Sequence, residues 1–167
     1  MSSLKTSLIL RVGQLLTAVL LACLSLAGQV QAQSRYSYSN DGSEVTDAKT
    51  GLVWQRCSQL QRWSGTTCVD NGGGFGITQE MALVLAKKQA GWRVPNVKEL
   101  SSLVDVSRTS PAIDTTAFPN VPPWPFWSST GYAGHDMLRN DAWFVNFSDG
   151  SVSNNSRNWA IDVRLVR

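Results

Sequence analysis

The chain has little of the chemistry on which most enzymes depend. It contains one histidine, His135, and three cysteines in 167 residues. A Ser-His-Asp site would need His135 itself, which stands in a polar loop between Gly134 and Asp136. The acidic residues form no recognisable pair for acid–base hydrolysis. These absences argue against an enzyme, and we expect a non-enzymatic protein.

Long apolar runs are also absent after the first residues. Lys5 and Arg11 precede an apolar stretch over residues 15–28, and a small-residue pattern ends at Ala32. We therefore predict a signal peptide over residues 1–32 and export of the rest. Since no second apolar run follows, we expect no membrane span in the mature chain.

A second interpretation of the leader stays open, because residues 20–23 resemble a bacterial lipobox ending at Cys23. The apolar run continues past Cys23 and Leu21 is unusual in that motif, so simple cleavage is favoured. Either way the protein is expected in the periplasm, at the cell surface or outside the cell.

The chain has 15 Lys and Arg against 12 Asp and Glu, and the leader takes two of the basic residues. The remaining charge is too small to predict a nucleic-acid partner.

The cysteine count fits export. Cys23 lies in the leader, which leaves Cys57 and Cys68 in the mature chain. In an oxidising compartment these two are expected to form a disulfide around a short loop. Such a loop would stabilise the fold by about 2–3 kcal/mol. A metal or redox pair is the alternative, but the spacing is too long for a CxxC site.

A β-hairpin is predicted over residues 44–47 and 52–55, joined by a turn. The turn ends in a glycine that can take a positive φ. Trp54 is expected in the core, with Gln55 and Arg56 facing outward. Four tryptophans are expected to be core residues: Trp54, Trp92, Trp127 and Trp143.

Residues 33–43 are interpreted as a linker or a first edge strand, and residues 56–76 as a flexible loop. Two helix patterns follow. The first begins after Thr78, a good N-cap, and ends near Gly91. The second begins after Asn96, with a glutamate three residues on that nearly completes a capping box.

The second half of the chain reads as β-structure. Residues 107–125 are proline-rich and irregular, and residues 126–130 form a strand. The most regular pattern is the aromatic run 142–147, which turns at Asp149-Gly150 into a return strand. Residues 159–166 alternate polar and apolar side chains and are expected to close the sheet. In the aromatic run the expected inward-facing side chains are Trp143, Val145 and Phe147.

These blocks follow the order seen in a known family. They are Thr46-Asp47, Thr50-Gly-Leu-Val-Trp-Gln-Arg-Cys57, Gly91-Trp-Arg-Val-Pro-Asn-Val-Lys-Glu-Leu100, Pro111-Ala-Ile-Asp114, Phe126-Trp-Ser-Ser-Thr130, Ala142-Trp-Phe-Val-Asn-Phe-Ser-Asp-Gly150 and Val163-Arg-Leu-Val-Arg167. The set resembles the C-terminal domain of Legionella-type collagen-like adhesins, the Lcl C-terminal domain family, over residues 44–167. This chain lacks the collagen-like Gly-X-Y region, and it has Leu165 where many members have cysteine.

The resemblance implies an α+β, C-type lectin-like fold with two helices flanking antiparallel β-sheet and one short-loop disulfide. It also implies surface-associated proteins, which in the adhesin members bind sulfated glycans. Many C-type lectins hold sugar through calcium, and Asp136, Asp141 and Asp149 are suitable ligand types. The Glu-Pro-Asn or Gln-Pro-Asp triplet of sugar-binding lectins is missing, however. Calcium is therefore not favoured, no cofactor is expected, and a metal site stays undetermined.

We predict the ligand-binding surface in the polar and aromatic loops beside the aromatic strand. Trp63 and Trp159 are candidates for stacking on a sugar ring or a partner, whereas Trp124 is left undecided; Arg93 and Arg164 look structural. The predicted site comprises Tyr132, His135, Asp136, Arg139, Asn140, Asn154, Asn155, Arg157 and Trp159. The expected function is adhesion through a glycan. The alternative is a protein-interaction module of a cell-envelope or pilus-like assembly, and the oligomeric state stays undetermined.

Overall fold

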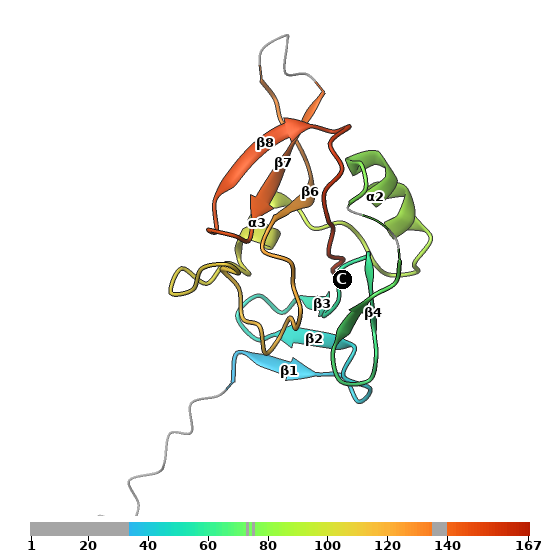
Figure 1. Ribbon diagram of the computed structural model, residues 1–167, viewed down its shortest axis with the longest axis vertical. Coiled ribbons are helices and arrows are strands. Elements are labelled where there is room, and N and C mark those ends of the chain that lie inside the picture. The colour runs from blue at the N-terminus through green and yellow to red at the C-terminus, as the bar shows by residue number, and fades with distance from the viewer. Residues whose placement is uncertain (1–33, 73, 75, 135–139) are drawn as a thin grey trace, which may run out of the picture. The chain divides into compact units, whose positions relative to one another are not determined.

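The computed structural model describes residues 34–72, 74, 76–134 and 140–167, and Figure 1 shows their arrangement. The predicted signal peptide and the site candidates His135, Asp136 and Arg139 lie outside the described residues. Arg35–Arg167 forms one structural unit, to which the following description applies. Within the described residues, no helix is long and apolar enough to cross a membrane.

The first sheet has three antiparallel strands in the order β1 (Tyr36–Tyr38), β2 (Glu44–Asp47) and β3 (Val53–Gln55). β2 and β3 form the hairpin predicted from the sequence. β1 lies within residues 33–43, which were interpreted as either a linker or a first edge strand, and it forms the edge strand. Val45 lies opposite Trp54 across the hairpin, and both are fully buried. Trp54 is thus a core residue, as predicted.

Arg56 is buried, contrary to the prediction that it faces outward. Its guanidinium donates to the carbonyl oxygens of Ala117, Gly42 and Thr116, each at 2.8 Å. The guanidinium also lies over the ring of Trp63, 4.4 Å from its centroid. Burial is tolerated because three N–H groups of the planar fork find carbonyl acceptors.

The predicted flexible loop contains a second, two-stranded sheet made of β4 (Gln61–Trp63) and β5 (Cys68–Asp70). Cys57 and Cys68 form the predicted disulfide, with their Cα atoms 5.4 Å apart. We call this segment, residues 57–70, the disulfide hairpin. The loop prediction was wrong here because three-residue strands with polar side chains carry no detectable alternation.

Two helices follow, α2 (Gln79–Lys87) and α3 (Val97–Ser101). Thr78 caps α2 as predicted, but the helix ends at a C-cap on Lys88, before Gly91. Asn96 caps α3 in a complete capping box with Glu99. α3 packs against β6 and β7 of the third sheet, and α2 contacts β6.

The third sheet consists of β6 (Pro125–Gly131), β7 (Asp141–Asn146) and β8 (Val152–Ser156), all antiparallel. Gly150 takes a φ of 80° in the β7–β8 turn, as the Asp-Gly pair predicts. Val145 is fully buried, as expected, whereas Trp143 is only half-buried. Phe144, on the opposite face of the strand, is buried instead. Both faces of β7 are therefore covered.

The C-terminal residues 161–166 are all buried and run between the sheets (Figure 1). They were expected to form a regular closing strand, but they make isolated bridges to different partners. Ile161 pairs with Ile77, and Val166 pairs with both Trp54 and Arg93. The bridging partners change every few residues. The segment is therefore extended but does not belong to any one of the three sheets. It joins the first sheet to the segment that precedes α2.

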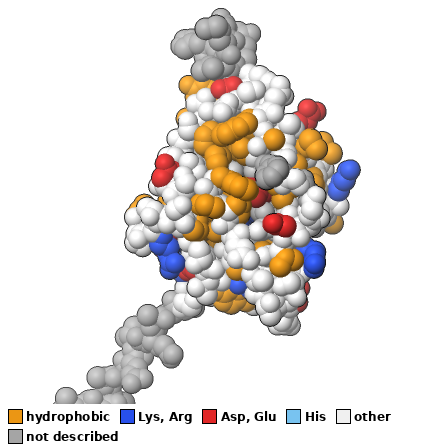
Figure 2. Space-filling view, in the orientation of Figure 1, with side chains coloured by type: hydrophobic (Ala, Val, Ile, Leu, Met, Phe, Trp, Pro, Cys, Tyr) orange, Lys and Arg blue, Asp and Glu red, His pale blue; other side chains and the backbone are white. Residues whose placement is uncertain are grey.

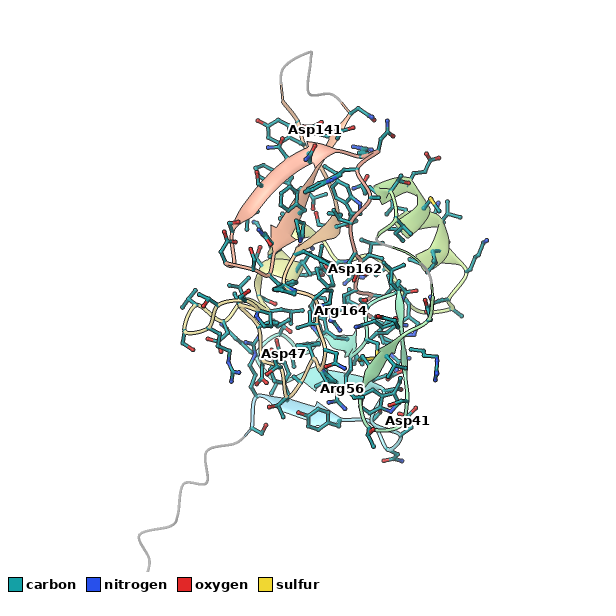
Figure 3. All side chains as sticks on the ribbon, in the orientation of Figure 1. Asp41, Asp47, Arg56, Asp141, Asp162 and Arg164 are labelled. Atoms are coloured by element: carbon teal, nitrogen blue, oxygen red, sulfur yellow. A yellow bond between two sulfur atoms is a disulfide. The ribbon has the colours of Figure 1, made fainter. Side chains whose placement is uncertain are left out.

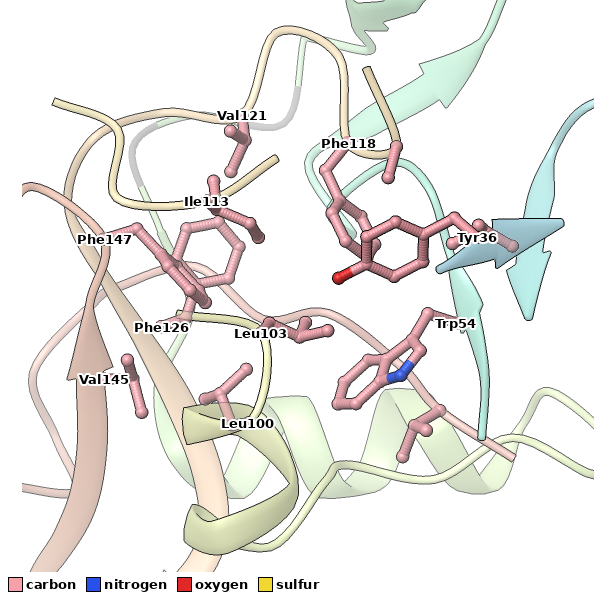
Figure 4. Close-up of a cluster of buried hydrophobic side chains, with 13 residues drawn as sticks. Tyr36, Trp54, Leu100, Leu103, Ile113, Phe118, Val121, Phe126, Val145 and Phe147 are labelled. Atoms are coloured by element: carbon pink, nitrogen blue, oxygen red, sulfur yellow. The ribbon is translucent and has the colours of Figure 1, made fainter. Parts of the chain in front are cut away.

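The main core gathers side chains from both three-stranded sheets, α3 and the proline-rich segment (Figure 4). Phe126 and Phe147 meet edge to face with ring centroids 5.2 Å apart. Tyr36 and Phe118 do the same at 5.6 Å. Trp127 is fully buried in a separate cluster, whereas the other expected core residue, Trp92, is only half-buried. The described structure is thus α+β, as predicted, with two helices and three small antiparallel sheets.

Candidate functional site

The structure separates two neighbouring asparagines of the predicted site. Asn154 lies opposite Trp143 in the β7–β8 register, and Asn155 lies opposite Ala142. Residues directly opposite each other share a face, and successive residues of a strand point to opposite faces. Asn154 and Asn155 therefore lie on different sides of the third sheet and cannot contact one small ligand together.

The two aromatic candidates are separated in the same way. The Tyr132 ring packs against Trp143, with centroids 5.1 Å apart, on the face that carries Asn154. The Trp159 ring packs against Phe144 at 5.5 Å, on the opposite face. Each ring already has an aromatic neighbour that holds it. The described members of the predicted site thus lie on both faces of the sheet instead of forming one cluster.

Arg157 makes contacts within the fold. Its backbone N–H donates to Asn140 O at 2.9 Å, and its Nε donates to Asp141 O at 3.2 Å. Its carbonyl accepts from Gln79 N, the first residue of α2, at 3.0 Å. These bonds tie the end of β8 to the start of α2 and to β7, so Arg157 has a structural role.

A pocket of about 420 Å³ lies elsewhere, between the disulfide hairpin and the proline-rich segment. We call it the Trp124 pocket. Its lining comes from three parts of the chain: the hairpin and the glycines after it, the end of the proline-rich segment, and the buried C-terminal segment. The lining residues used below are Gln61, Asp70, Asn120, Trp124 and Asp162.

Trp124 presents a fixed aromatic ring at this pocket, with 41% of the residue exposed. Proline precedes and follows it, which restricts the backbone on both sides. Its backbone N–H donates to Pro122 O at 2.9 Å, and its carbonyl accepts from Phe147 N at 3.1 Å. An exposed indole on such a constrained segment loses little freedom when a ligand binds.

Asn120 and Gln61 join the two walls. Gln61 Nε2 donates to Asn120 O at 2.8 Å, and Asn120 Nδ2 donates to Cys68 O at 2.8 Å. Asn120 takes a φ of 52°, a left-handed conformation that asparagine tolerates better than most residues. The proline-rich segment is thereby tied to the disulfide hairpin, and the pocket keeps its shape.

Asp162 supplies a buried carboxylate to the lining, with 1% of the residue exposed. Figure 3 shows it on the C-terminal segment close to Arg164. Burial raises the pKa of Asp162, while the side chain of Ser58, the backbone N–H of Val163, the charge of Arg164 and the side chain of Trp124 act in the opposite direction. The Val163 N–H donates to Oδ1 at 2.8 Å, which fixes the carboxyl group.

The pocket combines an indole face, amide groups and two aspartates. Its described lining includes no Lys or Arg. On the face shown in Figure 2, the basic side chains among the described residues are scattered and form no continuous area. The described residues also include no group of three His, Cys, Asp or Glu that could hold a metal ion. The arrangement is suited to a ligand that offers hydroxyl groups and an apolar ring face.

Sequence reasoning missed this pocket, although one signal was present. Trp124 stands between two prolines, and a tryptophan in such a segment is both rigid and hard to bury in a sheet. The sequence places Asp162 among the polar residues of a predicted closing strand and Asn120 in the irregular proline-rich segment. Nothing in their spacing shows that the chain returns to the disulfide hairpin.

The comparison with protein families adds to this geometry. The family model of the Lcl C-terminal domain matches residues 43–167. The chain belongs to the Lcl C-terminal domain family. The matched region of this Lcl C-terminal domain contains the disulfide hairpin, both helices and the Trp124 pocket. Membership suggests an adhesin-like module that is secreted or surface-associated. No curated protein matches the chain.

Proposed function

We propose that this Lcl C-terminal domain is an exported, non-enzymatic binding module that recognises glycan through the Trp124 pocket. The observation that carries the proposal is the exposed indole of Trp124, held between prolines beside the buried carboxylate of Asp162. An indole face packs against the C–H groups of a pyranose, while the amides and the exposed carboxylate of Asp70 bond its hydroxyls. The C-type lectin-like arrangement expected from the resemblance belongs to the same proposal.

Charge favours an uncharged sugar in this pocket over the sulfated glycans bound by adhesin relatives. Asp70 and Asp162 line it, and its described lining offers no cation to a sulfate. An anionic group would therefore lose its hydration without gaining an ion pair. A ligand with hydroxyl groups has no such cost, because carboxylate oxygens accept hydrogen bonds from them.

Two tryptophans make a matched pair for the test. Trp124 is 41% exposed and Trp159 is 40% exposed, so Trp124→Ala and Trp159→Ala each remove a similarly exposed indole. Wild type and both variants are applied to an array of neutral and sulfated glycans, with circular dichroism confirming that each is folded. We expect Trp124→Ala to weaken binding by about thirtyfold, the loss of a central aromatic contact worth about 2 kcal/mol. Trp159→Ala should bind like the wild type.

The opposite pattern, with Trp159 required and Trp124 dispensable, would place the site on the loops beside β7 and β8. Absence of glycan binding by the wild-type protein would overturn the proposal. It would favour the alternative, a protein-interaction module of the cell envelope. The absence of an enzymatic role is checked by mass spectrometry of any bound oligosaccharide after long incubation, where no cleavage product is expected.

A further inference from the structure

A second pocket, of about 330 Å³, shares Gln61 with the Trp124 pocket. We call it the glutamine pocket, because three other glutamines line it beside two tryptophans. The glutamines come from the end of β3, from the start of the disulfide hairpin and from the segment after α2. The residues that matter to its chemistry are Glu44, Gln55, Gln59, Trp63, Gln89 and Trp92.

The three glutamine side chains form a closed ring of hydrogen bonds. Gln59 Nε2 donates to Gln55 Oε1, and Gln55 Nε2 donates to Gln89 Oε1 at 2.9 Å. Gln89 Nε2 closes the ring by donating to Gln59 Oε1 at 2.7 Å. Each amide is therefore both a donor and an acceptor, and each is oriented by the other two.

Backbone hydrogen bonds hold the ring in place. Gln55 N donates to Leu165 O at 3.1 Å, and Gln59 N donates to Val163 O at 3.0 Å. Both acceptors belong to the buried C-terminal segment. Gln89 N donates to Ala86 O at 3.0 Å, at the end of α2. The three amides thus sit on rigid parts of the fold, so a ligand would not have to order them.

The ring leaves half of its hydrogen-bonding capacity unused. A primary amide has two N–H donors and an oxygen with two lone pairs. The ring uses one N–H and one lone pair of each glutamine, and no other hydrogen bond of Gln55 or Gln89 side chains is seen among the described residues. All three glutamines are only half-buried and line an open pocket. Adjacent donors and acceptors match sugar hydroxyls, each of which donates and accepts.

The two tryptophans are fixed beside this ring. A cation covers each indole: Arg56 lies 4.4 Å from the Trp63 centroid, and Arg167 lies 4.8 Å from the Trp92 centroid. Trp63 Nε1 also donates to Asp41 O at 2.9 Å. Both residues are half-buried and line the pocket, so they give its mainly polar surface a small apolar area next to the amides. The C–H groups of a pyranose need surface of this kind.

The described lining of the pocket includes no Lys or Arg. Glu44 is the one ionisable side chain in its described lining, and its carboxylate pairs with Arg167 at 2.6 Å. Arg56 and Arg167, which lie over the two indoles, are already engaged, Arg56 by three carbonyls and Arg167 by Glu44. A sulfate or uronate placed on the glutamine ring would therefore lose water and gain no unpaired cation. An uncharged pyranose with several hydroxyls replaces its hydrogen bonds to water with hydrogen bonds to the amides when it enters the pocket.

We propose that the glutamine pocket is a second carbohydrate site, selective for an uncharged pyranose unit. This second proposal rests on glycan recognition as the function of the domain but does not require that the Trp124 pocket bind sugar. The amide ring supplies the hydrogen bonds, and Trp63 and Trp92 supply the apolar contact. Gln61, common to both linings, places the two sites next to each other on one domain.

The test uses nuclear magnetic resonance, because glutamine side-chain NH₂ groups and indole N–H groups give separate signals. Labelled wild-type protein is titrated with maltohexaose, cellohexaose, mannohexaose and a heparin hexasaccharide. We expect a neutral hexasaccharide to shift the NH₂ signals of Gln55, Gln59 and Gln89, and heparin to leave them unchanged. Gln89→Met should weaken this response about tenfold, as expected for a lost ligand hydrogen bond. The matched control is Lys88→Met, the same replacement one residue earlier at an exposed position outside the pocket, which should respond like the wild type.

Trp124→Ala separates the two proposals, since it should abolish shifts at the Trp124 pocket and leave the glutamine signals responsive. If neutral hexasaccharides shift the Trp124 indole but none of the three glutamines, the second site is wrong and the proposed function stands. If heparin shifts the glutamines more than the neutral sugars do, the selectivity argument is wrong. No response anywhere overturns both proposals together.

Discussion

Replacing Arg164 with alanine should lower the free energy of unfolding by about 3–5 kcal/mol. Arg164 is fully buried, and its Nη1 donates to Gln55 O at 2.7 Å and to Arg56 O. Its guanidinium lies 4.5 Å from the ring centroid of Phe118. Alanine would leave the buried carbonyl of Arg56 and the part-buried carbonyl of Gln55 without this donor, at about 1–3 kcal/mol for a buried group, and a cavity beside the ring.

The desolvation of the Arg164 guanidinium partly offsets this loss of stability. Burial lowers the pKa of Arg164 to about 10, because the charged form is poorly solvated there. Its Nε and Nη2 have no hydrogen-bond partner among the described residues. Removing the guanidinium relieves that cost but leaves the nearby carboxylate of Asp162 without its positive neighbour. The lost carbonyl bonds and the cavity dominate the balance, so the change remains strongly destabilising.

Urea unfolding of the oxidised protein, followed by tryptophan fluorescence, measures the effect. Arg93→Ala is the control, because Arg93 forms an exposed ion pair with Glu99 at 2.7 Å and should contribute at most about 1 kcal/mol. Arg164→Met, which keeps apolar volume against Phe118, should fall between the two variants. The reasoning fails if Arg164→Ala is no more destabilising than Arg93→Ala at an unchanged m-value.

Three further predictions concern local features. The double variant Cys57→Ala/Cys68→Ala should lose about 2–3 kcal/mol by urea unfolding, because opening the short loop restores entropy to the unfolded chain; an equal midpoint for reduced and oxidised wild type would contradict this. Asn96→Ala should lose about 1 kcal/mol by removing the capping box of α3, and Asn96→Asp, which keeps an acceptor, should restore most of it. Burial raises the pKa of Asp47, but the bonds from Arg35 at 2.7 and 2.9 Å, together with those from Lys49 N–H and Thr50, outweigh this and hold the pKa below its usual range. Its stabilisation is therefore present above the unfolded pKa of about 4 and is lost as the pH falls through the lower folded value. Arg35→Gln should reduce this acid-dependent loss in a series of urea titrations at decreasing pH, and an unchanged pH dependence would rule the ion pair out as its source.

The local signals in the sequence predicted the parts of the fold that depend on neighbouring residues. Thr78 and Asn96 begin the two helices because their side chains bond the first free N–H groups, an interaction contained within four residues. Gly150 turns the β7–β8 hairpin for a similarly local reason. The disulfide followed from export and from the presence of two mature cysteines.

Elements whose form depends on distant partners were less predictable. The β4–β5 pair has three-residue strands, too short for a period of two to appear. Residues 161–166 alternate as a surface strand would, yet Asp162 and Arg164 are both buried because the segment passes between two sheets. Trp143 was expected inside, but both faces of β7 are covered and Phe144 takes the more buried position.

The sequence by itself determined the chemistry that the protein holds: helix caps, a hairpin turn, one disulfide and many tryptophans with few catalytic groups. It also carried the ordered blocks that place the chain in its family, now matched over residues 43–167. Only the tertiary structure decided where that chemistry meets. Trp124, Asp162 and Gln61 line one pocket, and three glutamines far apart in the chain close a ring. Such contacts arise when remote segments pack together to bury apolar surface, and residue spacing along the chain does not encode which segments will meet.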